Sequence, residues 1–351
     1  MKPAPSRAEE KPIAKAEQAP AVAVLGCGAW GRNLVRNFHA LGALRAVADP
    51  SEKSRGRARE LAPNAPLFED FRAVLRSPDI EAVVIATPAE THYALAMEAI
   101  EHGKHVFCEK PMAIRYRDGV ALERAAAAAK RVLMVGHLLE YHPAVVKLKE
   151  LIDEGTLGKI QYIYSNRLNF GKVRTEENAL WSFAPHDFAV ILRLVGEEPI
   201  EVTAVGGNYI TPGLTDVTVS CLQFRTGIRA HIFVSWLNPF KEQKLVVVGS
   251  QRMAVFNDVA AEGKLSLYDQ QVDLNGRQPV LRNGKIETVP IADDEPLRLE
   301  CRHFLEAVRD GKTPLTDGKS ALRVLRVLEA CQISLQLNGR PISVLDVRAE
   351  G

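Results

Sequence analysis

Lys110, in the tripeptide Glu109-Lys110-Pro111, is the side chain of this sequence best suited to proton transfer. The tripeptide directly follows residues 105–108, which are expected to form a strand. Burial disfavours the charged form of a lysine and so lowers its pKa towards neutrality. A lysine of this kind can act as a general base or acid towards a hydroxyl group. The alternative interpretation is a surface lysine in an ordinary loop.

A glycine-rich loop follows the apolar run 21–25. The loop reads Gly26-Cys27-Gly28-Ala29-Trp30-Gly31. This complete G-x-G-x-x-G pattern, between an expected strand and an expected helix, indicates a dinucleotide site. Gly26 permits the tight turn, Gly28 lets the backbone approach a pyrophosphate, and Gly31 allows the helix to pack on the strand. We expect every loop residue except Cys27 to contact the cofactor, at a helix N-terminus whose N–H groups attract anions.

Asp49 ends the next apolar run, 44–48, eighteen residues after Gly31. A carboxylate there can bind both ribose hydroxyls of an adenosine and would repel the 2′-phosphate of NADP, so NAD is the expected cofactor. A surface aspartate after a glycine turn is the alternative. Further cofactor contacts are expected at Thr87, Pro88, His92 and Glu109.

Strands and helices are expected to alternate from residue 21 to residue 135. Such alternation predicts a doubly wound parallel sheet with right-handed crossovers, the Rossmann architecture. Ligands on such sheets bind at the carboxyl ends of the strands, where the residues above lie. We therefore expect a dinucleotide-binding domain over residues 21–140.

After Gly136 the pattern changes to strands with hairpin-length gaps, which predicts a large, mostly antiparallel sheet over residues 141–351. Two helices are expected to close the chain. The expected strands cover 159–170, 200–209, 217–224, 228–236 and 244–249, with weaker candidates at 253–256 and 265–268.

The composition excludes several classes of protein. The chain has 351 residues, 46% hydrophobic and 25% charged, with a net charge of +2. No basic run suggests nucleic-acid binding, and no apolar stretch is long enough to span a membrane. The five cysteines have no zinc or redox spacing, so a metal-free, cytoplasmic protein is expected. The proline- and charge-rich residues 1–20 are expected to form a disordered tail.

Four motifs, in this order and spacing, resemble those of the Gfo/Idh/MocA oxidoreductases. They are the glycine-rich loop, Thr87-Pro88 with His92, Glu109-Lys110-Pro111, and Gly136-His137 with Tyr141-His142-Pro143. The resemblance extends from about Ala21 to the C-terminus. It implies that Lys110 is the catalytic lysine. It also implies an open-faced C-terminal sheet through which a homodimer or homotetramer could form.

That family usually carries a D-x-x-x-H pair on a helix of the second domain. Here His186 takes the histidine position, whereas Ser182 stands where the aspartate is expected. In a helix started by Pro185, His186 could assist Lys110 or bond the reacting oxygen. Asp187 is expected to point elsewhere on the helix. A polar residue near a helix start, without a catalytic role, is the alternative.

Residues 166–171 and 174–183 resemble the branch that acts on UDP-N-acetylhexosamines, including 3-dehydrogenases. The arginines of this region could pair with a diphosphate or a uronic carboxylate, the asparagines with hydroxyl or acetamido groups, and the tryptophan could offer a flat face. A polar surface loop is the alternative. The residues expected to bind substrate are Tyr141, Arg167, Asn169, Arg174, Asn178 and Trp181.

The sequence thus predicts an NAD-dependent dehydrogenase that oxidises the C3′ hydroxyl of a UDP-N-acetylated hexosamine or its uronic acid. Lys110 would be the general base and His186 its support. Two alternatives remain. One is a cyclitol or free-sugar dehydrogenase of the same family, and the other is an NAD-binding sensor without catalysis.

Overall fold

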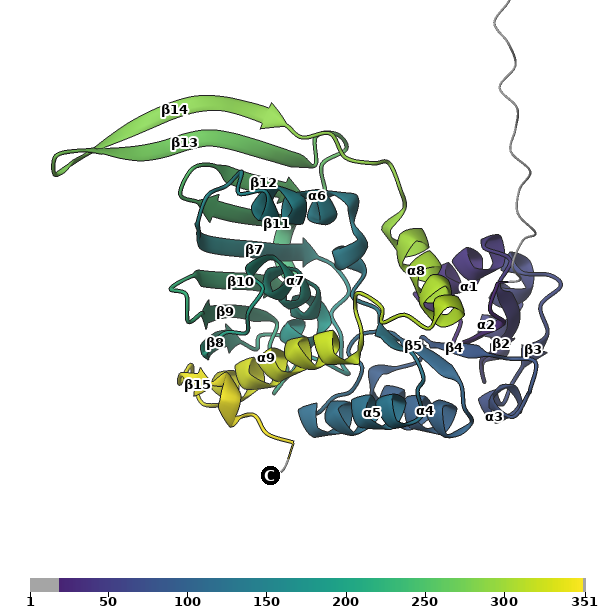
Figure 1. The fold of residues 1–351 in the computed structure, drawn as a ribbon. Helices are drawn as coiled ribbons and strands as arrows, with labels where there is room; N and C mark the ends of the chain where they lie inside the picture. The colour runs from purple at the N-terminus through teal and green to yellow at the C-terminus, as the bar shows by residue number, and fades with distance from the viewer. Residues whose placement is uncertain (1–18, 350–351) are drawn as a thin grey trace, which may run out of the picture.

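The computed structural model describes residues 19–349, which contain two β-sheets side by side (Figure 1). The tail expected over residues 1–20 lies outside the described residues, apart from Ala19 and Pro20. Within residues 19–349 we find no helix with the length and apolarity needed to cross a bilayer.

The first sheet has six parallel strands in the order β3-β2-β1-β4-β5-β6. The central strands are buried on both faces, as their continuous runs of valine, isoleucine and alanine require. The order and the parallel pairing confirm the predicted Rossmann sheet. The strands are β1 (Val22–Leu25), β2 (Leu44–Ala48), β3 (Leu67–Phe68), β4 (Ala82–Ile85), β5 (His105–Cys108) and β6 (Leu133–Val135).

Helices cover both faces of this sheet. One of them, α8 (Pro296–Asp310), comes from the C-terminal part of the chain and packs beside α1 (Figure 1). Phe304 of α8 lies against the rings of Phe38 and Phe107, at centroid distances of 6.3 and 5.5 Å. The helices that precede it in sequence are α1 (Gly31–Ala40), α2 (Glu52–Leu61), α3 (Phe71–Leu75), α4 (Ala89–Glu101) and α5 (Tyr116–Ala128).

The second sheet has nine strands in the order β14-β13-β12-β11-β7-β10-β9-β8-β15. All its pairs are antiparallel except β7 with β10, so the predicted mostly antiparallel sheet is confirmed. The strands are β7 (Ile160–Phe170), β8 (Glu201–Gly207), β9 (Val217–Gln223), β10 (Arg229–Ser235), β11 (Leu237–Gly249), β12 (Met253–Asn257), β13 (Leu265–Asn275), β14 (Gln278–Thr288) and β15 (Ile342–Ser343).

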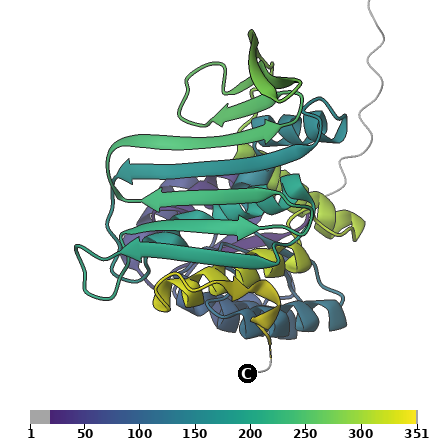
Figure 2. The ribbon, with the colours of Figure 1, turned by 90° about the vertical axis from the view of Figure 1, so that its left-hand side faces the viewer.

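Helices cover only one face of the second sheet. The other face, turned to the viewer in Figure 2, is open. On it Tyr164 stacks on His231 of the neighbouring strand, with ring centroids 5.3 Å apart. The remaining helical elements are η1 (Leu138–Tyr141), α6 (Pro143–Asp153), α7 (Ala179–Val195), α9 (Gly318–Gln336) and η2 (Val344–Asp346).

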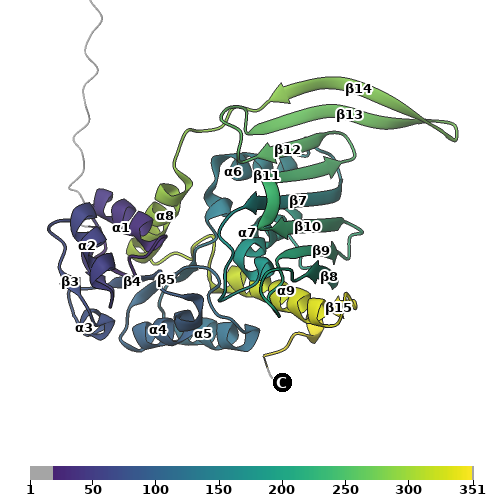
Figure 3. The ribbon, with the colours of Figure 1, turned by 180° about the vertical axis from the view of Figure 1, so that it is seen from behind.

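Three elements differ from the sequence-based expectations. The strand expected over 244–249 begins at Leu237, and the weak candidate over 265–268 extends into the β13–β14 hairpin, which projects beyond the rest of the molecule (Figure 3). The alternation used to find strands is lost in β14, because every one of its residues is exposed. Helix α7 begins at Ala179, so Pro185 lies inside the helix and not at its start.

The two sheets are joined by α9, which packs against α5 on one side and against α7 and β8 on the other. Trp181 of α7 packs against the apolar cores of both halves. This contact brings the N-terminal end of α7 to the carboxyl ends of the first sheet, where Lys110 lies.

Gly31→Ala is expected to destabilise the protein. A Cβ at Gly31 would stand far inside van der Waals contact with the carbonyl oxygen of Gly26, whereas a Cβ at Gly28 meets no described atom within 4 Å. Since backbone blocks the first position, we expect Gly31→Ala to lower the free energy of unfolding by about 3 kcal/mol or more. Gly28→Ala is the matched control, with a change within about 1 kcal/mol. Urea unfolding of both variants tests this, and equal losses would contradict it.

Candidate active site

Lys110 reaches from the first sheet to the second half of the chain. It follows β5, and its Nζ donates a hydrogen bond of 2.8 Å to the backbone carbonyl of Ser182 in α7. Pro185 lies inside that helix, and its missing N–H and its ring loosen the turn before it. The lysine is half-buried where the two halves of the molecule meet.

The environment of Lys110 favours its neutral form. Burial lowers the pKa of Lys110 from its ordinary value; the carboxylates of Glu177 and Glu109 oppose this shift, and the guanidinium groups of Arg174 and Arg167 add to it. A lysine with a lowered pKa holds a larger neutral fraction near neutral pH. It can therefore accept a proton from a hydroxyl group.

Two imidazoles lie within electrostatic reach of Lys110. Burial, and then the charge of Lys110, lower the pKa of His186 well below its usual range and that of His137 to about 3. Both rings are therefore neutral at physiological pH and can offer one donor and one acceptor each. The structure brings His186 to Lys110, as expected. His137 was expected only as part of a motif, and its position two residues after the end of β6 is the signal that indicates a strand-end site residue.

Four buried polar atoms of this region have no hydrogen-bond partner among the described residues. They are Nδ1 of His137, Oδ1 of Asn169, Oγ of Ser182 and Nδ1 of His186. Leaving a buried polar group unpaired costs roughly 1–3 kcal/mol, so such groups are rare unless a ligand or water completes them. Their concentration near Lys110 indicates a binding site for a polar molecule.

Glu109 is held in a fixed position beside Lys110. Its Oε1 accepts a 2.6 Å hydrogen bond from the indole Nε1 of Trp30, and its Oε2 accepts one of 3.3 Å from the Lys110 backbone N–H. A Cβ at Gly136 would lie 2.8 Å from that Oε2, so only glycine leaves room for the carboxyl group. Burial raises the pKa of Glu109 to about 7, against the Trp30 hydrogen bond and the Lys110 charge.

The glycine-rich loop fits a dinucleotide. Gly26 has φ +94°, and a Cβ there would lie 2.7 Å from the carbonyl oxygen of Ala86. Above Gly28 the space is free of described atoms, as a closely approaching pyrophosphate requires. Helix α1 begins directly after the loop, and no side chain among the described residues caps its first N–H groups. The Asn33 N–H already donates to the Trp30 carbonyl at 2.8 Å, and that of Arg32 donates weakly to the Gly28 carbonyl at 3.4 Å. This leaves the Gly31 N–H for an anion.

Asp49 links the ends of two strands. Its Oδ2 accepts from the Cys27 backbone N–H at 2.7 Å, and its Oδ1 accepts from that of Ser51 at 2.8 Å. A carboxylate has further lone pairs, so both contacts are compatible with the expected ribose contact. That contact stays a prediction, as do those of Thr87, Ala29 and the exposed Pro88.

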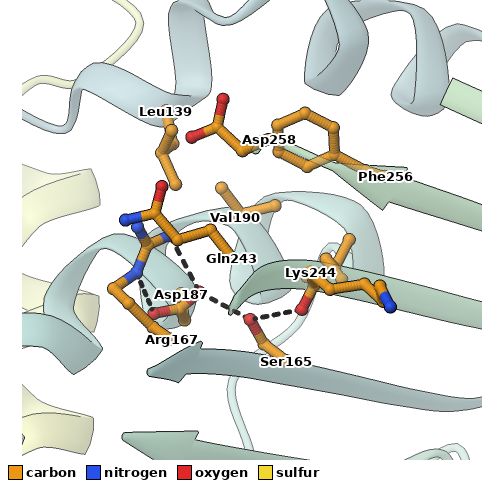
Figure 4. Close-up of a pocket in the computed structure, with 10 residues that line it drawn as sticks. Leu139, Ser165, Arg167, Asp187, Val190, Gln243, Lys244, Phe256 and Asp258 are labelled. Atoms are coloured by element: carbon orange, nitrogen blue, oxygen red, sulfur yellow. Dashed lines mark hydrogen bonds and ion pairs between the residues drawn. The ribbon is translucent and has the colours of Figure 1, made fainter. Parts of the chain in front are cut away.

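Arg167 was expected to bind substrate, but most of its donors face another side chain of the protein. It is not free to grip a ligand through its Nε edge, because its Nε and Nη2 donate to Asp187 at 2.8 and 3.2 Å (Figure 4). Ser165 donates to the same carboxylate at 2.6 Å. The pair lies beside a small pocket with room for about one water molecule. Asp187 faces β7, contrary to the expectation that it points elsewhere. It is the one acid in a largely apolar helix, and this is the sequence signal that it has a buried partner.

Two further expected substrate residues have structural roles. Asn178 caps α7, since its Oδ1 accepts from the Trp181 N–H at 3.1 Å, and its Nδ2 donates to Gln332 at 2.9 Å. The indole of Trp181 donates to the same Gln332 oxygen at 3.0 Å. Both side chains therefore fasten α7 to α9, a role that only the tertiary structure reveals.

The side chains of His92 and Tyr141 also make structural contacts within the protein. His92 is 1% exposed, and its ring nitrogens lie 2.7 Å from the carbonyl oxygen of Pro111 and 2.9 Å from that of Thr87. It ties the ends of two strands together. Tyr141 is 6% exposed and packs in the core of the first sheet, with its hydroxyl 3.3 Å from that of Thr316.

Arg174 has an exposed guanidinium and Asn169 an unpaired amide oxygen that a ligand could contact. Arg174 is 42% exposed and pairs with Glu177 at 3.1 Å, in the loop between β7 and α7. Glu177 was not among the expected site residues, although its charge raises the pKa of Lys110 more than that of any other acid does. Across residues 19–349 no cluster of three histidine, cysteine or acidic side chains is arranged to hold a metal ion.

Comparison with known proteins agrees with this arrangement. Residues 21–137 match the model of the Gfo/Idh/MocA oxidoreductase family, NAD-binding Rossmann fold, and residues 145–255 match that of the family's C-terminal domain. An inositol 2-dehydrogenase of Burkholderia multivorans is 30% identical over 72% of this chain and 78% of its own length. The chain belongs to the Gfo/Idh/MocA oxidoreductase family. It is an NAD-binding dehydrogenase of that family, and NAD as cofactor is thereby confirmed.

A second relative covers more of the chain. The UDP-N-acetylglucosamine 3-dehydrogenase of Acidithiobacillus ferrooxidans is 27% identical over 89% of this chain and 96% of its own length. Its solved structure superposes with a TM-score of 0.79 over 90% of this chain and 97% of that one. A putative oxidoreductase from Magnetospirillum magnetotacticum, 30% identical, superposes with a TM-score of 0.78 over 89% of this chain and all of its own. The family is thus shown, while the substrates named for these relatives differ.

Asp187→Asn is expected to be among the most destabilising changes in the second half of the chain. The side chains of Asp187 and Arg167 are only 3% and 12% exposed, so the change leaves a buried guanidinium without its counter-charge. We expect a loss of about 3–5 kcal/mol in the free energy of unfolding. The matched control is Glu177→Gln, which breaks a more exposed pair and should cost at most about 1 kcal/mol. If chemical denaturation gives equal losses, the buried pair does not stabilise the fold.

Proposed function

We propose that the protein oxidises the C3′ hydroxyl of a UDP-N-acetylated hexosamine, or of its uronic acid, to a ketone. The observation that carries the proposal is the half-buried Lys110, whose charge acts on a neutral His186, beside buried polar atoms that have no partner among the described residues. Asn169 and Ser182 contribute two of those atoms, an acceptor and a hydroxyl, which suit a ring bearing several hydroxyl or acetamido groups.

Lys110 takes the hydroxyl proton. The O–H bond breaks, an N–H bond forms at Nζ, and the C3′ hydrogen leaves with its electron pair as the carbonyl forms. NAD, when bound, supplies the hydride acceptor, as is usual for this chemistry. His186 and His137 hydrogen-bond the reacting oxygen and keep the alcohol aligned, and Lys110 releases its proton to solvent after the ketone has formed.

Arg174 favours a nucleotide sugar over a free polyol. Its side chain is 42% exposed and its charge acts on Lys110, so its guanidinium can reach a diphosphate or a uronic carboxylate of a ligand bound there. Alignment coverage does not separate the two candidates, since the 3-dehydrogenase relative aligns over 89% of the chain and the scyllo-inositol 2-dehydrogenase of Bacillus subtilis over 93%. The second candidate is a cyclitol dehydrogenase, and the 30% identity of the inositol enzyme supports it.

NADH formation at 340 nm with a panel of alcohols tests the proposal. We expect turnover with UDP-N-acetylglucosamine or its uronic acid and little with inositol or glucose. Lys110→Met should lower kcat by about 10²–10⁴-fold while NAD binding is kept. Because Lys110 must be deprotonated, the rate should rise with pH to a plateau below the ordinary lysine pKa of about 10.4.

A matched arginine variant separates the two candidates. Arg174→Ala should raise KM for the UDP-sugar by roughly 10-fold or more, the effect of losing one charge-assisted contact, and leave kcat nearly unchanged. Arg252→Ala, on the β12 side of the sheet, should change neither constant. Turnover confined to inositol would overturn the nucleotide-sugar proposal, and no turnover with NAD bound would favour the sensor.

We also propose that copies associate through the open face of the second sheet. On β7 and β8 this face carries Tyr164, Phe170 and Val205, of which the last two are 80% and 52% exposed. Apolar groups gathered on an open sheet are typical of protein–protein contacts. Sedimentation of the purified chain as a dimer or tetramer is expected, and a monomer at micromolar concentration would contradict the proposal.

A further inference from the structure

Trp30 is an exposed aromatic side chain within the glycine-rich loop. It is 40% exposed, whereas the neighbouring Cys27 is fully buried. The buried face of α1 is formed by other residues of the helix, and the proton transfer at Lys110 does not involve an indole. The packing of the fold and the chemistry of the site therefore leave the ring of Trp30 unexplained.

The indole crosses the end of the first sheet. Its Nε1 donates to Glu109 at 2.6 Å, which joins the loop after β1 to the residue after β5. These strands are not neighbours, because β4 lies between them. The ring must therefore extend over the carboxyl end of β4. In doubly wound sheets the dinucleotide binds along these strand ends.

The orientation of the ring is fixed at both ends. The backbone of Trp30 forms the N-cap of α1, and the acceptor Glu109 is itself held by the Lys110 N–H and by the narrow space above Gly136. An exposed indole face is thus presented one residue away from Lys110. The hydride acceptor must approach that lysine, since proton and hydride leave the same alcohol.

The two redox forms of nicotinamide differ in charge. The oxidised ring is a cation and the reduced ring is neutral. The face of tryptophan attracts cations more strongly than any other side-chain ring. The ionised fraction of the Glu109 carboxyl, which accepts the indole hydrogen bond, adds negative charge at the same place. We propose that Trp30 is a redox-selective contact that binds the oxidised nicotinamide ring more tightly than the reduced one.

Such a contact would weaken the hold on the cofactor once the hydride has been transferred. The favourable interaction is lost on reduction, so release of NADH is promoted, while the equilibrium between the two bound forms is shifted towards NAD+. The inference concerns the dinucleotide alone. It stands or falls independently of which alcohol is the substrate.

Calorimetric titration of the full chain with NAD+ and with NADH measures the selectivity directly. In Trp30→Leu we expect the dissociation constant of NAD+ to rise about 2- to 30-fold more than that of NADH. Trp30→Phe keeps an aromatic face but lacks the N–H, and it should lie between the two. An equal rise for both forms in both variants would overturn the proposal, since Trp30 would then only fill space. Unchanged binding of both forms would overturn it too.

Fluorescence supplies a second readout that needs no turnover. A pyridinium cation stacked on indole quenches its emission, so NAD+ should quench the wild-type protein. The chain has three tryptophans, and the quenching should vanish in Trp30→Phe. Trp236→Phe is the matched control and should keep it, because that indole is fully buried in the second half of the chain, where it donates to Asp216. Quenching that survives in Trp30→Phe would assign it to another ring and contradict the proposal.

Discussion

The hydrogen bond from Lys110 to the Ser182 carbonyl is the contact on which the site depends. The donor follows a strand of the first sheet and the acceptor belongs to a helix that covers the second, so neither half of the chain forms the site alone. The lysine is withdrawn from water only where the two halves meet. Its lowered pKa is thus a consequence of how α7 is seated, and α7 is seated by Trp181, Asn178 and Gln332.

The first sheet could be predicted from the sequence almost strand by strand, because its buried strands are short continuous apolar runs that end at glycine, proline or acidic residues. The same reasoning located Lys110 and the glycine-rich loop at strand ends. The second half was harder. Arg167 and Asn178 have the chemistry of ligand-binding residues, yet their partners, Asp187 and Gln332, lie 20 and 154 residues away. No local pattern shows that a polar group is already satisfied by a distant one.

Burial, more than ion pairing, determines the protonation states of the titratable groups around Lys110. His137 and His186 are kept neutral because a buried lysine stands beside them and because water is excluded. Arg167, which would otherwise add a second uncompensated cation, is neutralised by Asp187. As a result, the Lys110 amine can change its protonation state while the neighbouring histidines and Arg167 keep theirs. This is the condition that a general base at neutral pH requires.

The unpaired atoms near Lys110 limit what can bind there. Two imidazole nitrogens, one amide oxygen and one hydroxyl oxygen are buried without partners. An apolar ligand would leave all four unpaired, at a combined cost of several kcal/mol, whereas a polyhydroxylated ring can complete them. These atoms therefore suit a hydroxyl-rich ligand better than an apolar one. Arg174 differs from these atoms, since its side chain is 42% exposed and pairs with Glu177 at 3.1 Å, so burial does not require it to find a partner in a ligand.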